Sequence, residues 1–246
     1  MKSEHSEAGS GEPVQYYLAV PGLPGAELAL LAARGALLAH RRFRTRPGYG
    51  RWLAGTMAKV VLRAGAEEVA GIARAHDGLL LPEPPDQPLL AVLRPRPRSR
   101  APFVAGLKLY AGSVGAVPGA AWPAAGLWVP LFANGDLDLS AGKMAAQTAH
   151  AALALLGSAG GTPRWAAWQE AGMPMALLRV PGAVLRRLAL AGQACAVADA
   201  GRTAVPGGSL TVAAGPPSDP DWWPRDEATL LAAGDARSVP RPRPTG

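Results

Sequence analysis

The chain has 246 residues, enough for one large domain or two of ordinary size, and we expect two. Hydrophobic residues make up 49% and charged residues 17% of the sequence, a balance typical of globular proteins. The net charge of +7 and the pI of about 10.2 are compatible with a polyanionic partner, and a single cysteine, Cys195, excludes an internal disulfide and a cysteine-based zinc site.

The first segment, MKSEHSEAGSGEP at residues 1–13, is polar and is expected to be disordered. It lacks the apolar core of a secretory signal. No stretch of the chain approaches the roughly 18 uninterrupted apolar residues of a membrane span. These features predict a cytoplasmic protein without a membrane partner.

Two basic stretches follow, and neither contains an acidic residue. The first lies between His40 and Arg63 and consists of Arg41, Arg42, Arg44, Arg46, Arg51 and Lys59; the second consists of Arg94, Arg96, Arg98 and Arg100. Such stretches favour a polyanion, because each phosphate that they neutralise releases counterions. A solvated, arginine-rich loop is the alternative interpretation.

The sequence repeats its pattern. LAARGALLAH at residues 31–40 resembles MAAQTAHAAL at 144–153, and an Arg-Trp pair follows each. KVVLRAGAEEVAGIA from Lys59 then resembles MALLRVPGAVLRRLA from Met175, and LLAVLRP from Leu89 resembles LTVAAGP from Leu210. We interpret this self-similarity as an internal duplication.

The repeat and the composition divide the chain into five segments. Residues 111–126 are rich in glycine, alanine and proline, and residues from 218 onward are rich in turn formers and charges. The predicted division is a disordered start at 1–13, a first domain at 14–110, a linker at 111–126, a second domain at 127–217 and a proline-rich tail at 218–246, with one docked helical turn near 227–233.

Strands and helices alternate within the second domain. The expected strands are 127–133, 175–180, 194–199 and 209–215, and the expected helices are 143–156, 165–171 and 183–190. Alternation of this kind predicts an α/β fold with a four-stranded mixed sheet flanked by helices. The duplication predicts that this unit is present twice, as a pseudo-dimeric tandem.

Three polar residues lie on one face of the helix that begins near residue 143. Lys143, Gln147 and His150 have the spacing i, i+4, i+7, which places them on the same side. A solvated outer face is the alternative interpretation of such a stripe. Lys143, however, lies in the first turn, where unpaired backbone N–H groups and the helix dipole attract anions.

A second polar cluster, DAGRT at residues 199–203, follows the apolar strand ACAVA. It places Asp199 at the carboxyl end of a strand, the edge at which open α/β sheets carry their sites. An aspartate that only caps the turn through local N–H bonds is the alternative.

Together the two clusters resemble a known signature. GKMAAQTAH, followed about fifty residues later by DAGRTAVPGGSLTVAAGP, is similar to the pattern of the type-two peptidyl-tRNA hydrolases, the archaeal and eukaryotic-type family. The resemblance covers residues 127–217. It implies a mixed four-stranded α/β fold and hydrolysis of the ester between a peptide and the 3′-terminal ribose of tRNA, with no metal or cofactor.

The resemblance also implies roles for individual residues. The family's catalytic positions fall on Lys143, Asp199 and Thr211, and other signature positions, assigned here to substrate binding, fall on Gln147, His150, Arg202, Thr203 and Ser209. The sequence departs from the pattern at Ala141 and Ala204, where the family commonly has lysine and glutamine. These departures predict weaker or altered tRNA contacts.

The first domain retains the hydrophobic pattern without the signature. In the sequence alignment Leu30, Arg34 and Leu37 stand opposite Lys143, Gln147 and His150. The first domain is therefore expected to replace the second subunit of a homodimer, so that the protein is either a monomeric pseudo-dimer or a homodimer. A non-catalytic RNA-binding module on the same fold is the alternative to an enzyme.

Overall fold

The computed structural model describes residues 11–82, 89–199 and 206–235. Residues 1–10 of the expected disordered start lie outside the described residues, and so does the tail beyond 235. No helix in the described ranges is long and apolar enough to span a membrane.

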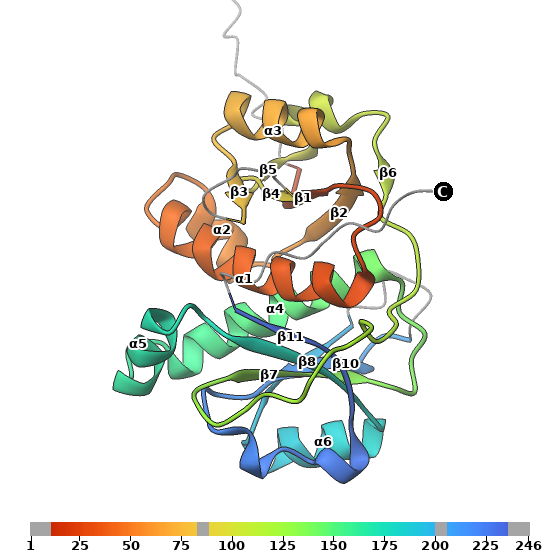
Figure 1. Ribbon diagram of the computed structural model, residues 1–246. Helices are drawn as coiled ribbons and strands as arrows, with labels where there is room; N and C mark the ends of the chain where they lie inside the picture. The colour runs from red at the N-terminus through yellow and green to blue at the C-terminus, as the bar shows by residue number, and fades with distance from the viewer. Residues whose placement is uncertain (1–10, 83–88, 200–205, 236–246) are drawn as a thin grey trace, which may run out of the picture.

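The described elements stack in five layers (Figure 1). Helices α1 (Gly25–Phe43) and α4 (Ala141–Ala159) lie across the middle, with one sheet above them and a second sheet below. Helix α3 (Ala66–Ala75) covers the outer face of the first sheet, and α6 (Gly182–Leu190) covers the outer face of the second. Both central helices therefore pack against a sheet and against each other.

The first sheet has the strand order β3-β4-β1-β2-β6, with β5 paired to β1. Its strands are β1 (Pro13–Ala19), β2 (Lys59–Arg63), β3 (Leu79–Leu81), β4 (Leu90–Val92), β5 (Arg96–Pro97) and β6 (Lys108–Leu109). The central pair β1 and β2 is parallel, and the other pairs are antiparallel.

The second sheet has the order β9-β10-β7-β8-β11. Its strands are β7 (Val129–Asn134), β8 (Met175–Val180), β9 (Cys195–Ala198), β10 (Leu210–Ala214) and β11 (Thr229–Gly234). Again only the central pair, β7 and β8, is parallel. The main path of the first sheet and the second sheet thus share strand order and direction, which is compatible with a tandem of two similar units.

The remaining helices are short. They are α2 (Tyr49–Ala54), α5 (Pro163–Glu170) and the 3-10 turns Arg98–Arg100, Pro102–Val104, Pro220–Trp222 and Arg225–Glu227. The predicted mixed α/β architecture is confirmed, whereas the prediction of four-stranded sheets is wrong: the sheets have six and five strands in the described residues.

The extra strand of the second sheet comes from the predicted tail. Strand β11 pairs antiparallel with β8, from Thr229 opposite Arg179 to Gly234 opposite Met175, where the sequence predicted a helical turn. The apolar run TLLAAG covers what would otherwise be an open edge of β8. Leu231 is buried in the main core, and Trp223 is buried in the smaller core below the second sheet.

The predicted linker also packs onto the folded body. The N–H of Val117 donates to the carbonyl of Leu231 in β11, and the N–H of Ala141 donates to the carbonyl of Gly112. Val114 is buried. Residues 111–126 therefore hold both the edge of the second sheet and the start of α4.

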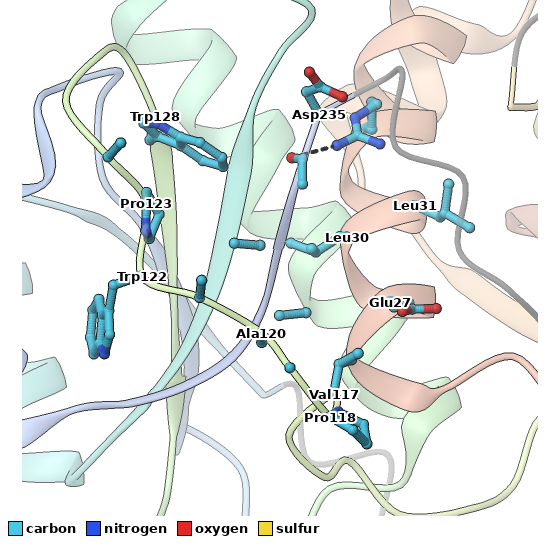
Figure 2. Close-up of a pocket in the computed structure, with 17 residues that line it drawn as sticks. Glu27, Leu30, Leu31, Val117, Pro118, Ala120, Trp122, Pro123, Trp128 and Asp235 are labelled. Carbon is cyan, nitrogen blue, oxygen red and sulfur yellow. Dashed lines mark hydrogen bonds between the residues drawn. The ribbon is translucent and has the colours of Figure 1, made fainter.

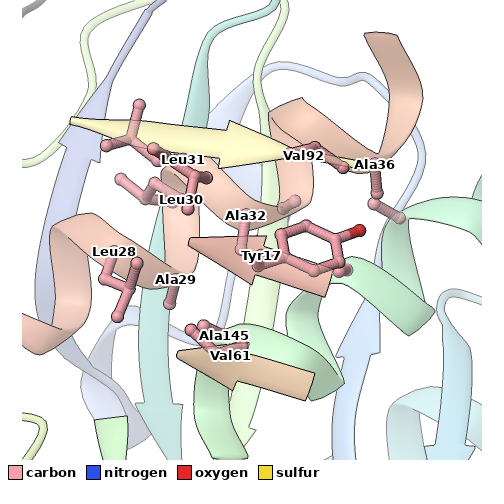
Figure 3. Packing of buried hydrophobic residues seen from close by; sticks show 14 of the residues in the cluster. Tyr17, Leu28, Ala29, Leu30, Leu31, Ala32, Ala36, Val61, Val92 and Ala145 are labelled. Atoms are coloured by element: carbon pink, nitrogen blue, oxygen red, sulfur yellow. The ribbon is translucent and has the colours of Figure 1, made fainter. Parts of the chain in front are cut away.

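One hydrophobic core joins the two halves through the central helices. Leu28 and Ala29 of α1, Val61 of β2 and Ala145 of α4 belong to the same buried cluster (Figure 3). Small side chains allow the two helices to approach closely, and the Thr148 hydroxyl donates to the carbonyl of Ala29 at 2.9 Å. The halves form one body.

Both central helices have 19 residues. Counted from their first residues, Glu27, Leu31 and Arg34 occupy the places of Lys143, Gln147 and His150. The sequence alignment had placed Leu30 opposite Lys143, three residues further along than Glu27. The difference arises because alanine-rich stretches match each other at several offsets.

Candidate active site

The centre of the site is an ion pair between the two halves of the signature. The Lys143 ammonium contacts Oδ2 of Asp199, and Nε2 of Gln147 donates to the same oxygen at 3.2 Å. The Asp199 side chain is 1% exposed and the Lys143 side chain 20%, so that of the two only the lysine is accessible to solvent. The structure therefore brings three of the predicted site residues into contact.

Lys143 is positioned by the start of α4. Ser140 caps the helix in an extended conformation, and its hydroxyl accepts from the N–H of Lys143 at 3.4 Å. The loop before it is held by Asp136, which accepts from the N–H of Gly182 at 3.1 Å. The third helical residue is thereby fixed against the end of β9.

The start of α4 also lies against the first half of the chain. A Cβ atom added to Gly142 would lie 2.5 Å from the Tyr110 carbonyl oxygen, so glycine is required for this approach. The first N–H of the helix, that of Ala141, is occupied by Gly112. The expected attraction of anions to unpaired N–H groups at this terminus is reduced accordingly.

Asp199 follows β9 directly. Its N–H donates to the carbonyl of Ser209 at 2.9 Å, and its carbonyl accepts from the N–H of Gly208 at 2.8 Å. These two bonds close the β9–β10 connection and direct the carboxylate toward α4. Ser209 thus contributes its backbone to the site.

Thr211 lies one strand away from the ion pair. It is fully buried on β10, and its hydroxyl donates to the carbonyl of Val197 at 3.1 Å. This bond ties β10 to β9 two residues before Asp199. Arg202 and Thr203, the other predicted signature residues, lie outside the described residues.

His150 lies two turns further along α4 and contacts the first half of the chain. Its Nδ1 is 3.0 Å from Nζ of Lys59 at the start of β2. Burial and the nearby ammonium groups of Lys59 and Lys143 lower the pKa of His150 well below its ordinary value. The imidazole is therefore neutral at pH 7.

Sequence reasoning missed Lys59 as a site residue, because it considered this lysine only as a member of a basic stretch. The one available signal is a comparison between the repeats: β8, which resembles β2, begins with the buried Met175 where β2 begins with Lys59. A lysine in place of a buried methionine is unusual enough to mark the position.

A pocket of about 570 Å³ is lined by most of these site residues, but not by Ser209 or Thr211. One wall is formed by α4 and the end of β9, with Lys143, Gln147, His150 and Asp199, and the other by the first half, with Lys59, Arg98 and Tyr110. The site thus lies between the halves of the chain, and both contribute to it. Within the described ranges, no group of three or more His, Cys, Asp or Glu side chains could hold a metal ion.

A second pocket, of about 480 Å³, lies on the other central helix (Figure 2). Glu27, Leu30 and Leu31 of α1 line it together with Trp128, the linker and the end of β11. Like the first pocket, it combines a central helix of one half with the edge strand of the other.

The chemistry of the second pocket is different. Its helix carries Glu27, Leu31 and Arg34 in place of Lys143, Gln147 and His150. The guanidinium of Arg34 donates to the carbonyl of Gly234 at 3.0 Å, and burial lowers the pKa of Arg34 to about 10. The arrangement of lysine, glutamine and aspartate is therefore not repeated among the described residues here.

Comparison with known proteins agrees with the predicted resemblance. Residues 129–221 match the family model of the peptidyl-tRNA hydrolase PTH2, a span that begins with β7 and includes Lys143, Asp199 and Thr211. No curated protein matches the chain. The resemblance of the carboxy-terminal half to this family is thus confirmed, and the match ends before β11.

Proposed function

We propose that the protein is a peptidyl-tRNA hydrolase, which cleaves the ester between a peptide and the 3′-terminal ribose of tRNA by direct attack of water. The observation that carries the proposal is the contact of Lys143 and Gln147 with the buried carboxylate of Asp199, at the wall of a pocket within a segment that matches this family. The match supports this activity at the level of the family.

In the proposed mechanism, water attacks the carbonyl carbon of the ester and Asp199 accepts its proton. Lys143 stabilises the negative charge that develops on the carbonyl oxygen. The bond to the ribose oxygen then breaks, and this oxygen takes up the proton that Asp199 accepted from the water, which returns the carboxylate to its ionised form. The products are a peptide with a free carboxyl group and tRNA with a free ribose hydroxyl.

The mechanism suits an ester. A ribose oxygen is a better leaving group than an amide nitrogen, so no protein nucleophile is needed. Gln147 holds the Asp199 carboxylate through its amide, and Thr211 holds β9, from which Asp199 projects. We assign Gln147 and Thr211 as positioning residues, and Lys143 and Asp199 as catalytic residues.

tRNA is the proposed partner, the proposed location is the cytoplasm, and no cofactor is invoked. The packing of α1 against α4 across the two halves supports a monomeric pseudo-dimer over a homodimer.

The test is incubation of the protein with tRNA that carries an N-acetylated amino acid. Release of deacylated tRNA by the wild-type protein, and its loss in Lys143→Met, supports the hydrolase. Binding of tRNA without release supports the alternative, an RNA-binding module. That alternative is favoured by Ala141 and Ala204, the two positions at which the sequence departs from the family's pattern.

A further inference from the structure

Lys59 is a basic residue of the pocket that the proposed hydrolysis does not use. Its Nζ lies 3.0 Å from Nδ1 of His150 and 4.8 Å from the centre of the Trp52 ring, and it donates to the carbonyl of Met57 at 3.3 Å. These partners are neutral. Within the described part of the chain, no carboxylate lies at ion-pair distance from Lys59.

A structural role does not require a charge at this position. Met175 begins the matching strand of the second sheet and is fully buried there. A lysine that lines a pocket beside an imidazole and an indole costs desolvation that a methionine does not. Burial indeed lowers the pKa of Lys59 well below its ordinary value. An arriving anion would offset this cost.

We propose that Lys59, supplied by the amino-terminal half, binds a backbone phosphate of the 3′-terminal nucleotides in the pocket whose reactive pair belongs to the carboxy-terminal half. This inference rests on the proposed function. It gives the amino-terminal half a direct part in the site, beyond that of a structural replacement for a second subunit.

The location along α4 supports a phosphate. His150, the contact of Lys59, is seven residues from Lys143, which corresponds to about 10 Å along the helix axis. Lys59 is therefore placed away from the ester and beside the part of the substrate that continues from it. A peptide with a blocked amino group offers no backbone charge, whereas a nucleotide chain offers one phosphate per residue.

Other polar groups in the pocket fit a nucleotide chain. Arg98 also lines the pocket on the side of Lys59. The aspartates of the pocket belong to the other wall: Asp199 pairs with Lys143, and Asp138 precedes α4. The positive charge is thus concentrated on the wall that the first half provides.

The experiment measures binding of the trinucleotide cytidylyl-cytidylyl-adenosine by full-length protein across a range of salt concentrations. Lys59→Met introduces the residue found at the matching position of β8, Met175, and Lys59→Arg keeps the charge. Lys108→Met removes a charge from the exposed strand β6 and serves as the matched control.

We expect Lys59→Met to raise the Kd for the trinucleotide roughly tenfold, as for the loss of one charged hydrogen bond. The slope of log K against log salt should fall by about 0.7, since one phosphate contact is lost on a single strand. Lys59→Arg should retain most of the binding, and Lys108→Met should leave the slope unchanged. In hydrolysis assays KM should rise more than kcat falls, whereas Lys143→Met should lose kcat.

A folded Lys59→Met protein with the wild-type Kd and salt slope would overturn the proposal. If this variant does not fold, amine-reactive labelling of the wild-type protein decides: the trinucleotide should protect Lys59 and not Lys108, and absence of protection overturns the proposal. Trinucleotide binding that depends on Lys59 in a protein without hydrolysis would refute the proposed function alone. Hydrolysis that is indifferent to Lys59 would refute the phosphate contact alone.

Discussion

Nε2 of Gln147 lies 3.2 Å from Oδ2 of Asp199, the same oxygen that pairs with the Lys143 ammonium. A neutral donor and a cation therefore share one carboxylate oxygen across two elements, α4 and the end of β9. Both donors favour the ionised form of this carboxyl, which is the form that can accept a proton from water.

Asp199→Asn should leave a folded protein with little activity. Asparagine keeps the size of the side chain and removes the charge that accepts a proton, so kcat should fall by a factor of about 10² to 10³. Release of N-acetylated amino acid from tRNA measures kcat, and circular dichroism checks the fold. Wild-type turnover in a folded Asp199→Asn protein would refute the assignment of this residue as the base.

Gln147→Glu should shift the dependence of activity on pH. A second carboxylate beside Asp199 raises the pKa of the Asp199 carboxyl, because like charges disfavour the ionised form. The acidic limb of the kcat profile should therefore move to higher pH, whereas Gln147→Leu should lower kcat without that shift. Superimposable pH profiles for the wild-type and Gln147→Glu proteins would contradict the contact.

Gly142→Ala should destabilise the protein and impair the site. The added Cβ would lie 2.5 Å from the Tyr110 carbonyl oxygen, a backbone atom that cannot yield without moving β6 or α4. A lower Tm is expected, together with a lower kcat. Gly157→Ala is the matched control in the same helix: its Cβ meets nothing within 4 Å, and a stability gain of about 0.5–1 kcal/mol is expected. Equal effects of the two changes would contradict the close approach.

His150 should make the protein less stable in mild acid. In the unfolded chain it takes up a proton near pH 6.5, but in the folded protein its pKa is well below that value. Between these two pKa values the unfolded state binds more protons, so stability falls as pH falls, by at most about 1.4 kcal/mol per pH unit. Urea unfolding near neutral pH and in mild acid measures this change in the free energy of unfolding.

His150→Gln provides the comparison. It removes this titration while leaving the other histidines with lowered pKa, His40 and His76, in place. The variant should therefore lose less stability than the wild-type protein over the same change of pH. An identical loss in both proteins would show that His150 does not titrate abnormally.

Leu231→Ala should test whether β11 is part of the fold. Leu231 is 1% exposed, and removal of a buried leucine side chain typically costs about 2–5 kcal/mol. Thr229→Ala, at the exposed start of the same strand, should change stability little. If both variants unfold at the wild-type urea concentration, β11 does not belong to the core.

Much of the second half could be predicted from sequence, because its signals are local. The strand at 175–180 and the helix near 183–190 were expected within one residue of β8 and α6. Lys143 and Asp199 are recognisable from short motifs, whereas their contact depends on the strand order β9-β10-β7, which the sequence did not predict. The sequence alone does not determine which residue of α1 corresponds to which residue of α4, because alanine-rich stretches align at several offsets.

Two other features depend on contacts between distant residues. TLLAAG is a short run among prolines and charges, and it becomes a strand only because the edge of β8 is available to pair with it. The contact between Lys59 and His150 joins residues 91 positions apart and is created by the packing of one half on the other. Local patterns cannot report either of them.

The placement of the pocket has a consequence for how the protein can be divided. Expression of residues 127–235 alone would retain Lys143 and Asp199. It would expose the face of α4 that packs on α1, and it would remove the pocket wall that carries Lys59. The shared core and the pocket therefore both depend on the presence of the two halves.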